Sequence, residues 1–248
     1  MQNLPKKAFV LAAGLGSRML DLTNDCPKPM LIVGGKTMLD HALDALEEVG
    51  VEEVVVNTHY LADIIHKHLE TRTSPKITIS HEEEVLETGG GVKNAIEFFG
   101  SEPFYVLNSD VVWTDKVQSS LKTMGENWDS DKMDLMLLLH PLETALFYEG
   151  PGDYFMEGDC APAILTKFGR SDKIANYVVA GPRIVHPRLF ENYAEGKSSF
   201  RDLFIKAEDA GRLYGQHHEG QWFHVGTPEA LEETNKILSA QNKEKKIG

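Results

Sequence analysis

Residues 8–19 read Ala8-Phe9-Val10-Leu11-Ala12-Ala13-Gly14-Leu15-Gly16-Ser17-Arg18-Met19, and Cys26-Pro27-Lys28-Pro29-Met30 follows a few residues later. An apolar run that leads into a glycine-rich loop is typical of a buried strand followed by an anion site, because the loop presents bare backbone N–H groups. Arg18 and Lys28 add positive charge close behind this loop. The combination indicates a site for a nucleoside triphosphate.

Two commoner glycine loops are excluded by single residues. A dinucleotide-binding loop, G-x-G-x-x-G, needs a third glycine where Met19 stands. Gly35-Lys36-Thr37 matches the end of a Walker A loop, but Met30 occupies the position of that loop's first glycine. We therefore expect residues 34–37 to form a tight turn that runs into a helix N-cap.

Composition bounds the class of protein. A chain of 248 residues with 42% hydrophobic residues suits one globular α/β domain, or a domain with a small appendage. The 25 basic and 38 acidic residues give a formal net charge of −13. This excess of negative charge argues against nucleic acid or an anionic membrane as a partner, but leaves room for one nucleotide in a local basic cage.

The cysteine count and the N-terminal residues bear on the compartment. Cys26 and Cys160 alone form neither a disulfide framework nor a zinc site, so we expect free thiols in a reducing cytoplasm. Lys6-Lys7 before an apolar run faintly resembles a signal peptide, but the run breaks at Gly14, which favours a first core strand. We expect no membrane-spanning segment. The oligomeric state stays open between a monomer and a small homo-oligomer.

Strand and helix patterns alternate through the first half of the chain. Strands are expected at 8–12, 53–57, 76–80 and 104–107, and helices over 39–49, 61–69 and 92–99. Thr37 and Asp40 form a capping-box-like start for the first helix. This alternation predicts a doubly wound, mostly parallel α/β sheet with crossover helices.

The second half has a different pattern. A strand is expected at 134–140, followed by an irregular segment over 141–158. Further strands are expected at 177–185 and 212–218, with a helix at 200–207. Pro187 opens a short helix, and Thr227 and Pro228 begin a final one. We expect these later strands to form a mixed or antiparallel extension of the sheet.

The pattern L-A-A-G-x-G-x-R followed by P-K-P resembles the signature of the sugar-1-phosphate nucleotidyltransferases, and the resemblance extends from Ala8 to about Leu238. It implies transfer of a nucleotidyl group from a nucleoside triphosphate to a sugar 1-phosphate, with release of pyrophosphate and with Mg²⁺ as cofactor. It further implies a Rossmann-like α/β fold in one domain over 1–240. Residues 1–115 would bind the nucleotide, 116–240 would cover the sugar site, and 241–248 would form a polar tail.

Within this family, residues 87–91 and 108–115 resemble the uridylyltransferases that act on N-acetylmuramate α-1-phosphate in peptidoglycan recycling, which implies UTP as the donor. The same signature occurs in mannose- and heptose-1-phosphate guanylyltransferases, so base and sugar stay open. A non-catalytic regulator that binds a nucleotide sugar is a further alternative. Such a regulator needs no basic side chains to bind the departing pyrophosphate, so the presence of Arg18 and Lys28 favours catalysis.

Three residues are the expected catalytic groups. Both reactants are anions, so the reaction needs cations, aligned donors and in-line positioning. Arg18 is expected to hold the β- and γ-phosphates with its planar guanidinium. Lys28, between two prolines, faces the reacting phosphates in the family. Asp110 ends the predicted strand at 104–107, where ligands bind in open α/β sheets, and would hold Mg²⁺ against the α-phosphate.

The expected second metal ligand departs from the family pattern. The family shows an aspartate before V-G-T, whereas this chain has His224 there, and Ser109 replaces the usual glycine before Asp110. A neutral imidazole binds divalent ions, but Mg²⁺ prefers oxygen. Four roles are therefore open for His224. It could ligate a softer ion such as Mn²⁺, or hold a metal-bound water or a phosphate oxygen. The metal could instead be held by Asp110, phosphates and water alone, or His224 could have a structural role.

The resemblance assigns the remaining contacts. Glycines at 89–91 would allow close backbone approach to the base. The expected nucleotide-binding residues are Ala12, Ala13, Gly14, Gly16, Ser17, Arg18, Lys28, Glu82, Thr88, Gly89 and Gly90, with Asn57 a weaker candidate. The expected sugar-binding residues are Asn108, Asp153, Ala180 and Gly181.

Overall fold

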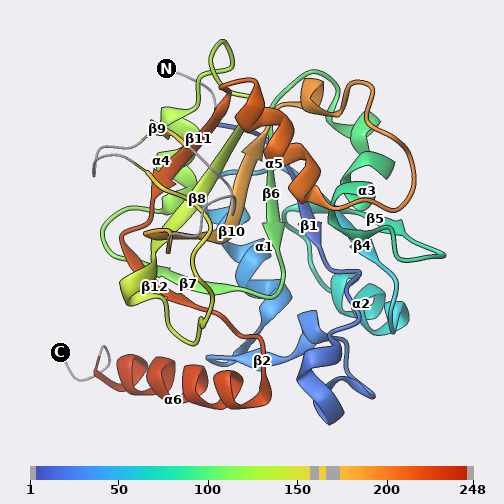
Figure 1. The fold of residues 1–248 in the computed structure, drawn as a ribbon. Coiled ribbons are helices and arrows are strands. Elements are labelled where there is room, and N and C mark those ends of the chain that lie inside the picture. Colours follow the sequence, from blue (N-terminus) through green and yellow to red (C-terminus); the bar gives the residue numbers. More distant parts are fainter. Residues whose placement is uncertain (1–3, 157–161, 166–173, 245–248) are drawn as a thin grey trace.

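A computed structural model describes residues 4–156, 162–165 and 174–244. Its centre is an eight-stranded sheet, counted over those residues, in the order β5-β4-β1-β6-β10-β8-β11-β9 (Figure 1). The strands are β1 (Lys7–Leu11), β4 (Glu53–Thr58), β5 (Lys76–His81), β6 (Phe104–Asn108), β8 (Leu135–Pro141), β9 (Ala163–Ile164), β10 (Tyr177–Val185) and β11 (Leu213–His217).

The first four strands in that order form the parallel half of the sheet. Phe9 of β1 lies between Val55 of β4 and Val106 of β6, and β5 pairs in parallel with β4. The chain moves outward from β1 through β4 to β5, and then returns to the other side of β1 for β6. In open α/β sheets, ligands bind at the carboxyl ends of the strands where the order reverses. This rule places a site after Leu11 and Asn108.

The other half of the sheet is mixed. β10 pairs antiparallel with both β6 and β8, β11 is parallel to β8, and β9 is antiparallel to β11. The register of β10 on β8 shifts between Val179 and Arg183. The predicted mostly parallel sheet with a mixed extension is confirmed.

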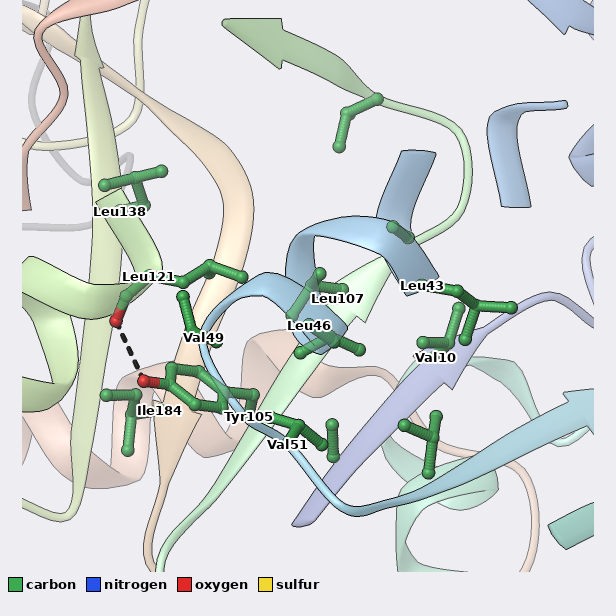
Figure 2. Close-up of a cluster of buried hydrophobic side chains, with 14 of the residues drawn as sticks. Val10, Leu43, Leu46, Val49, Val51, Tyr105, Leu107, Leu121, Leu138 and Ile184 are labelled. Carbon is green, nitrogen blue, oxygen red and sulfur yellow. Dashed lines mark hydrogen bonds between the residues drawn. The ribbon is translucent and has the colours of Figure 1, made fainter. Parts of the chain in front are cut away.

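Helices cover both faces of the sheet. The helices are α1 (Met38–Glu48), α2 (Ala62–Leu69), α3 (Glu87–Asn94), α4 (Ser120–Asn127), α5 (Phe200–Asp209) and α6 (Pro228–Glu244). On one face, α1, α2 and α4 share a buried apolar cluster with Val10 and Leu107. Figure 2 shows part of this cluster, in which the Tyr105 hydroxyl donates to the Leu121 carbonyl over 2.8 Å. On the other face, α3 and α5 pack over Phe9 and Val106. Apolar contacts therefore fix the parallel strands from both sides.

Local sequence signals place many element ends correctly. The Thr37 side chain accepts a hydrogen bond from the Asp40 backbone N–H over 2.9 Å at the start of α1. Gly34 and Gly35 form the turn between β2 (Ile32–Val33) and β3 (Lys36–Thr37), as predicted. The helix expected over 92–99 is instead interrupted at Ala95, where α3 gives way to the 3-10 turn η3 (Ile96–Phe99).

Some elements lie outside the sequence prediction. β7 (Val112–Asp115) and β12 (Gly220–Phe223) form a separate antiparallel pair, and α4 was not expected either. The 3-10 turns η1 (Ser17–Thr23), η2 (Lys28–Met30) and η4 (Leu142–Thr144) were not expected either. The turn η5 (Pro187–Phe190), by contrast, is the short helix predicted to begin at Pro187.

The C-terminal helix extends into the expected tail. α6 continues to Glu244, so the tail predicted to begin at residue 241 is helical in its described part, and residues 245–248 lie outside the description. Cys160 also lies outside the described residues. Over the described ranges, we find no helix with the length and apolar character needed to cross a membrane.

Candidate active site

The glycine-rich loop after β1 opens into a cavity of about 390 Å³. Its walls come from the carboxyl ends of β1, β4 and β6, from the P-K-P segment and from the start of α3. A cavity of this size, at the point where the strand order reverses, suits a small ligand. The expected nucleotide-binding residues that line it are Ala12, Ala13, Gly14, Gly16, Ser17, Arg18, Lys28, Glu82 and Thr88.

The glycine loop packs directly on the segment that carries Lys28. Gly16 adopts a φ of +66°, which a side chain rarely adopts, and a Cβ there would lie 2.9 Å from the Lys28 Cβ. Glycine is therefore required at this position for both backbone and packing reasons. Met19, which takes the place of a third glycine, is fully buried in the loop.

A buried polar chain joins the glycine loop to α3. The Ala12 N–H donates to Asn57 Oδ1 over 2.7 Å, and Asn57 Nδ2 donates to Glu82 Oε1 over 2.7 Å. Glu82 Oε2 in turn accepts from the Leu86 N–H over 2.9 Å. Each step has one donor and one acceptor, so the carboxylate fixes the orientation of the amide, and the amide fixes the start of the loop.

The β6 end is tied to the β1 end in a similar way. The Ser109 hydroxyl donates to the Leu11 carbonyl over 2.6 Å. A glycine at this position would lack that bond. Ser109 therefore holds the two strand ends together beside the cavity.

Lys28 and Asp110 form the central ion pair of the site. Lys28 Nζ lies 3.0 Å from Asp110 Oδ2, and the lysine side chain is buried. Burial alone would raise the pKa of Asp110, but the charge and hydrogen bond of Lys28, together with the nearby His224 and Arg18, hold it below its ordinary value. Asp110 is therefore an anion in a cluster that is otherwise rich in positive charge.

His224 lies beside Arg18, just after β12. A Cβ at Gly226 would be 2.7 Å from His224 Nε2 and 3.5 Å from Arg18 Nη1. A second cavity lies beside the start of α6, and Arg18, Tyr148 and His224 line it. Arg18 lines both cavities. Burial, followed by the charge of Arg18, lowers the pKa of His224, so its imidazole is neutral at neutral pH. The structure thus places His224 near the charged cluster but outside the walls of the first cavity.

The side chains of the cavity are compatible with a metal ion that is held partly by the protein and partly by substrate phosphates. Among the residues that the structure describes, no cluster of three or more His, Cys, Asp or Glu side chains is arranged to hold a metal ion. Mg²⁺ is commonly held by one or two carboxylates together with substrate phosphates and waters. Asp110 supplies one such carboxylate at the cavity wall. Ligation by Asp110 and His224 stays a prediction.

The expected sugar-binding residues divide into two pairs. Asn108 lines the cavity, and Gly181, with a φ of +108°, lies beside it: a Cβ there would be 3.8 Å from the Asn108 Cβ. The other two have structural partners and do not line the cavity. The Ala180 carbonyl accepts from Trp222 Nε1 over 2.9 Å, and Asp153 Oδ2 accepts from the Val179 N–H over 2.8 Å.

Gly89 and Gly90 have a packing role that the sequence motif did not indicate. Both backbone N–H groups donate to the Ser198 carbonyl, and a Cβ on Gly90 would overlap the Gly196 carbonyl oxygen. The space that these glycines leave is filled by the loop before α5, and neither glycine lines the cavity. Packing of α3 on this loop therefore requires both glycines. Their contact with a base stays a prediction.

One residue at the site was missed altogether. Arg183 lies within the apolar strand β10, and its Nη2 donates to Asn108 Oδ1 over 2.7 Å. A lone basic residue inside an otherwise apolar strand is the signal that could have identified it.

Comparison with known proteins agrees with this geometry. The chain belongs to the nucleotidyl transferase family, whose model matches residues 7–144. It is 39% identical to the N-acetylmuramate alpha-1-phosphate uridylyltransferase of Caulobacter vibrioides, over 93% of this chain and 96% of the relative. It is 31% identical to mannose-1-phosphate guanylyltransferase 1 of Arabidopsis thaliana, over 90% of this chain and 62% of the relative.

A solved structure confirms the fold. The crystal structure of UDP-glucose pyrophosphorylase complexed with UDP-glucose superposes with a TM-score of 0.80 and 18% identity, over 96% of this chain and all of that one. The sequence-based assignment to the sugar-1-phosphate nucleotidyltransferases is confirmed by the family match and by these relatives.

Proposed function

We propose that the protein transfers the uridylyl group of UTP to N-acetylmuramate α-1-phosphate, forming a UDP-sugar and pyrophosphate. The observation that carries this proposal is the Lys28–Asp110 ion pair in the wall of a glycine-loop cavity. The similarity to the Caulobacter uridylyltransferase over nearly the whole chain supports the choice of base and sugar.

The residues of the cavity suit the charge problem of this reaction. The sugar phosphate oxygen attacks the α-phosphorus of the triphosphate, and negative charge develops on the departing pyrophosphate. Arg18 and the backbone N–H groups of the glycine loop neutralise the β- and γ-phosphates, and Lys28 stabilises the reacting phosphates. Nucleophile and leaving group are both anions, so positioning and charge neutralisation account for the acceleration without a covalent enzyme intermediate.

Asp110 is the residue that would hold a divalent cofactor. When bound, an ion such as Mg²⁺ supplies positive charge at the α-phosphate, and Mn²⁺ becomes the better ion if His224 takes part as a nitrogen ligand. The Lys28–Asp110 pair keeps the carboxylate ionised before the substrate arrives.

The proposed substrate UTP indicates the cellular compartment of the protein. UTP is a cytoplasmic metabolite, so we assign the protein to the cytoplasm, where the product would serve peptidoglycan recycling. The alternative activity, transfer of guanylyl to mannose 1-phosphate, is favoured by the similarity to the Arabidopsis guanylyltransferase. Guanylyl transfer to a heptose 1-phosphate is an alternative of the same reaction type.

Pyrophosphate release tests the proposal. UTP and GTP are each incubated with N-acetylmuramate, mannose, heptose and glucose 1-phosphates, in Mg²⁺ and in Mn²⁺. Release with UTP and N-acetylmuramate α-1-phosphate is expected. No release with any pair, while a nucleotide sugar still binds, would instead identify a non-catalytic regulator.

The Lys28→Met variant tests the assigned residue within the same assay. It should lower turnover by about a hundredfold or more, as loss of an electrostatic donor does in other enzymes. The matched control is Lys36→Met, because Lys36 pairs with Asp44 over 2.6 Å on the exposed side of α1. The control should keep the turnover of the natural protein. Equal turnover in both variants would contradict the role of Lys28.

A further inference from the structure

Arg183 is a buried cation without a carboxylate in contact among the described residues. Its exposed fraction is 4%, and its register partners, Val106 of β6 and Leu137 of β8, are both apolar. Burial lowers the pKa of the guanidinium to about 10, against the opposing effect of the negative charge of Asp110, so it still carries its charge at neutral pH. An apolar side chain would suit these neighbours better, so packing alone does not account for an arginine here.

The contacts of the guanidinium are few and specific. Nη2 donates to Asn108 Oδ1 over 2.7 Å, and Cζ lies 4.5 Å from the centre of the Phe200 ring. Its Nε is buried and has no hydrogen-bond partner in the described part of the chain. The guanidinium therefore lies over the Phe200 ring of α5, and the bond to Asn108 is its polar anchor.

This bond decides which way the Asn108 amide points. A guanidinium only donates, so the atom of Asn108 that faces it is the carbonyl oxygen. The amide nitrogen, with its two donors, is then the group that Asn108 can offer to the cavity it lines. Without Arg183, the amide could turn over and offer an acceptor instead.

We propose that Arg183 is a positioning residue that sets sugar specificity: it holds Asn108 so that the amide N–H groups donate to an oxygen of the sugar 1-phosphate. This inference rests on the proposed function and concerns the sugar side of the site. The substrate atom at this place must be an acceptor, such as a hydroxyl, carboxylate or acetamido oxygen. The nucleotide side is oriented separately, by Asn57 and Glu82.

The separation of the two sides gives a sharp kinetic test. Arg183→Met keeps an unbranched stem but removes the charge and the donors, and should raise the KM for the sugar 1-phosphate about tenfold while the KM for the nucleoside triphosphate stays within about twofold. Arg183→Lys keeps a charged donor that reaches almost as far as Nη2 and should recover most of the sugar affinity. Sugar KM unchanged in Arg183→Met, both KM values raised together, or no recovery in Arg183→Lys would each overturn the inference.

Arg188→Met is the matched control for lost stability. Arg188 binds Asp134 and the Met133 carbonyl, at the opposite end of the sheet from the cavity residues. This control should lower the melting temperature and leave both KM values unchanged. A purely structural Arg183 would behave in the same way as Arg188.

A direct measurement on the natural protein covers the case in which Arg183→Met does not fold. The side-chain ¹⁵N–¹H signals of Asn108 should shift on titration with UDP-N-acetylmuramate and stay in place with UTP. Absence of that shift, despite binding of the nucleotide sugar, would overturn the inference. Failure of the proposed function has a different signature, because the natural protein would then release no pyrophosphate with any substrate pair.

Discussion

Exchanging the amide of Asn57 and the carboxylate of Glu82 between the two buried positions should preserve stability and UTP binding. Either substitution alone should lower both. Asn57 and Glu82 are 1% and 2% exposed, and every atom of the pair has its hydrogen-bond partner. In the double variant Asn57→Asp/Glu82→Gln, the new aspartate accepts from Ala12 N–H and from the new glutamine amide. The glutamine oxygen still accepts from the Leu86 N–H. All donors and acceptors are matched again.

The single changes leave identifiable mismatches. Glu82→Gln leaves either the Leu86 N–H or the Asn57 amide facing a donor, at a cost of about 1–3 kcal/mol. Asn57→Asp puts a second carboxylate at hydrogen-bond distance from Glu82, at a cost of about 3–5 kcal/mol for an uncompensated buried charge. If the double variant stays within about 1 kcal/mol of the natural protein, the coupling energy is at least about 3 kcal/mol.

Urea unfolding followed by circular dichroism at pH 7 measures these energies, and the KM for UTP should rise in each single variant and recover in the double. The exposed pair Gln118–Glu126, in which Gln118 Nε2 donates to Glu126 Oε2 over 2.9 Å, is the matched control. Its reversal, Gln118→Glu/Glu126→Gln, should show a coupling under about 1 kcal/mol. Additive losses at Asn57 and Glu82 would refute the assigned orientation of the network.

Two further predictions concern histidines. Burial, reinforced by the adjacent His140, lowers the pKa of His218 to about 4, which is below its value in the unfolded chain. The unfolded chain therefore binds the proton more readily, and the free energy of unfolding falls as the pH drops below about 6.5. The free energy of unfolding should lose about 2 kcal/mol from this group between pH 7 and pH 5, and urea titrations of His218→Gln should show a flatter pH dependence; an equal slope in both proteins would refute the assignment. His224→Asp should lower the Mg²⁺ concentration needed for half-maximal pyrophosphate release and shift the ion preference from Mn²⁺ toward Mg²⁺, because oxygen suits Mg²⁺ better; identical metal titrations in both forms would show that residue 224 does not touch the metal.

The parts of the fold that the sequence predicted are those encoded locally. The apolar run of β1, the Thr37 cap of α1 and the Pro228 start of α6 each depend on a few adjacent residues. The central cavity was predictable for the same reason, since its glycine loop, Arg18 and Lys28 lie within one short segment that packs on itself.

The missed features join residues that are distant in the chain. β7 and β12 are four residues each and pair Trp113 with Trp222, so neither strand carries a periodic pattern long enough to identify it. Arg183 and Asn108 meet only because β10 runs antiparallel beside β6. The packing of Gly90 on the loop at Gly196 was also missed, because its motif carries no information about a segment so distant in the chain.

The most direct test of the proposed function is a competition in one vessel. The protein is given equal concentrations of UTP and GTP, together with equal concentrations of N-acetylmuramate α-1-phosphate and mannose 1-phosphate, in Mg²⁺. Mass spectrometry then quantifies each nucleotide sugar that forms. UDP-N-acetylmuramate should be the predominant product. Predominant GDP-mannose, or no nucleotide sugar at all, would contradict the proposed function.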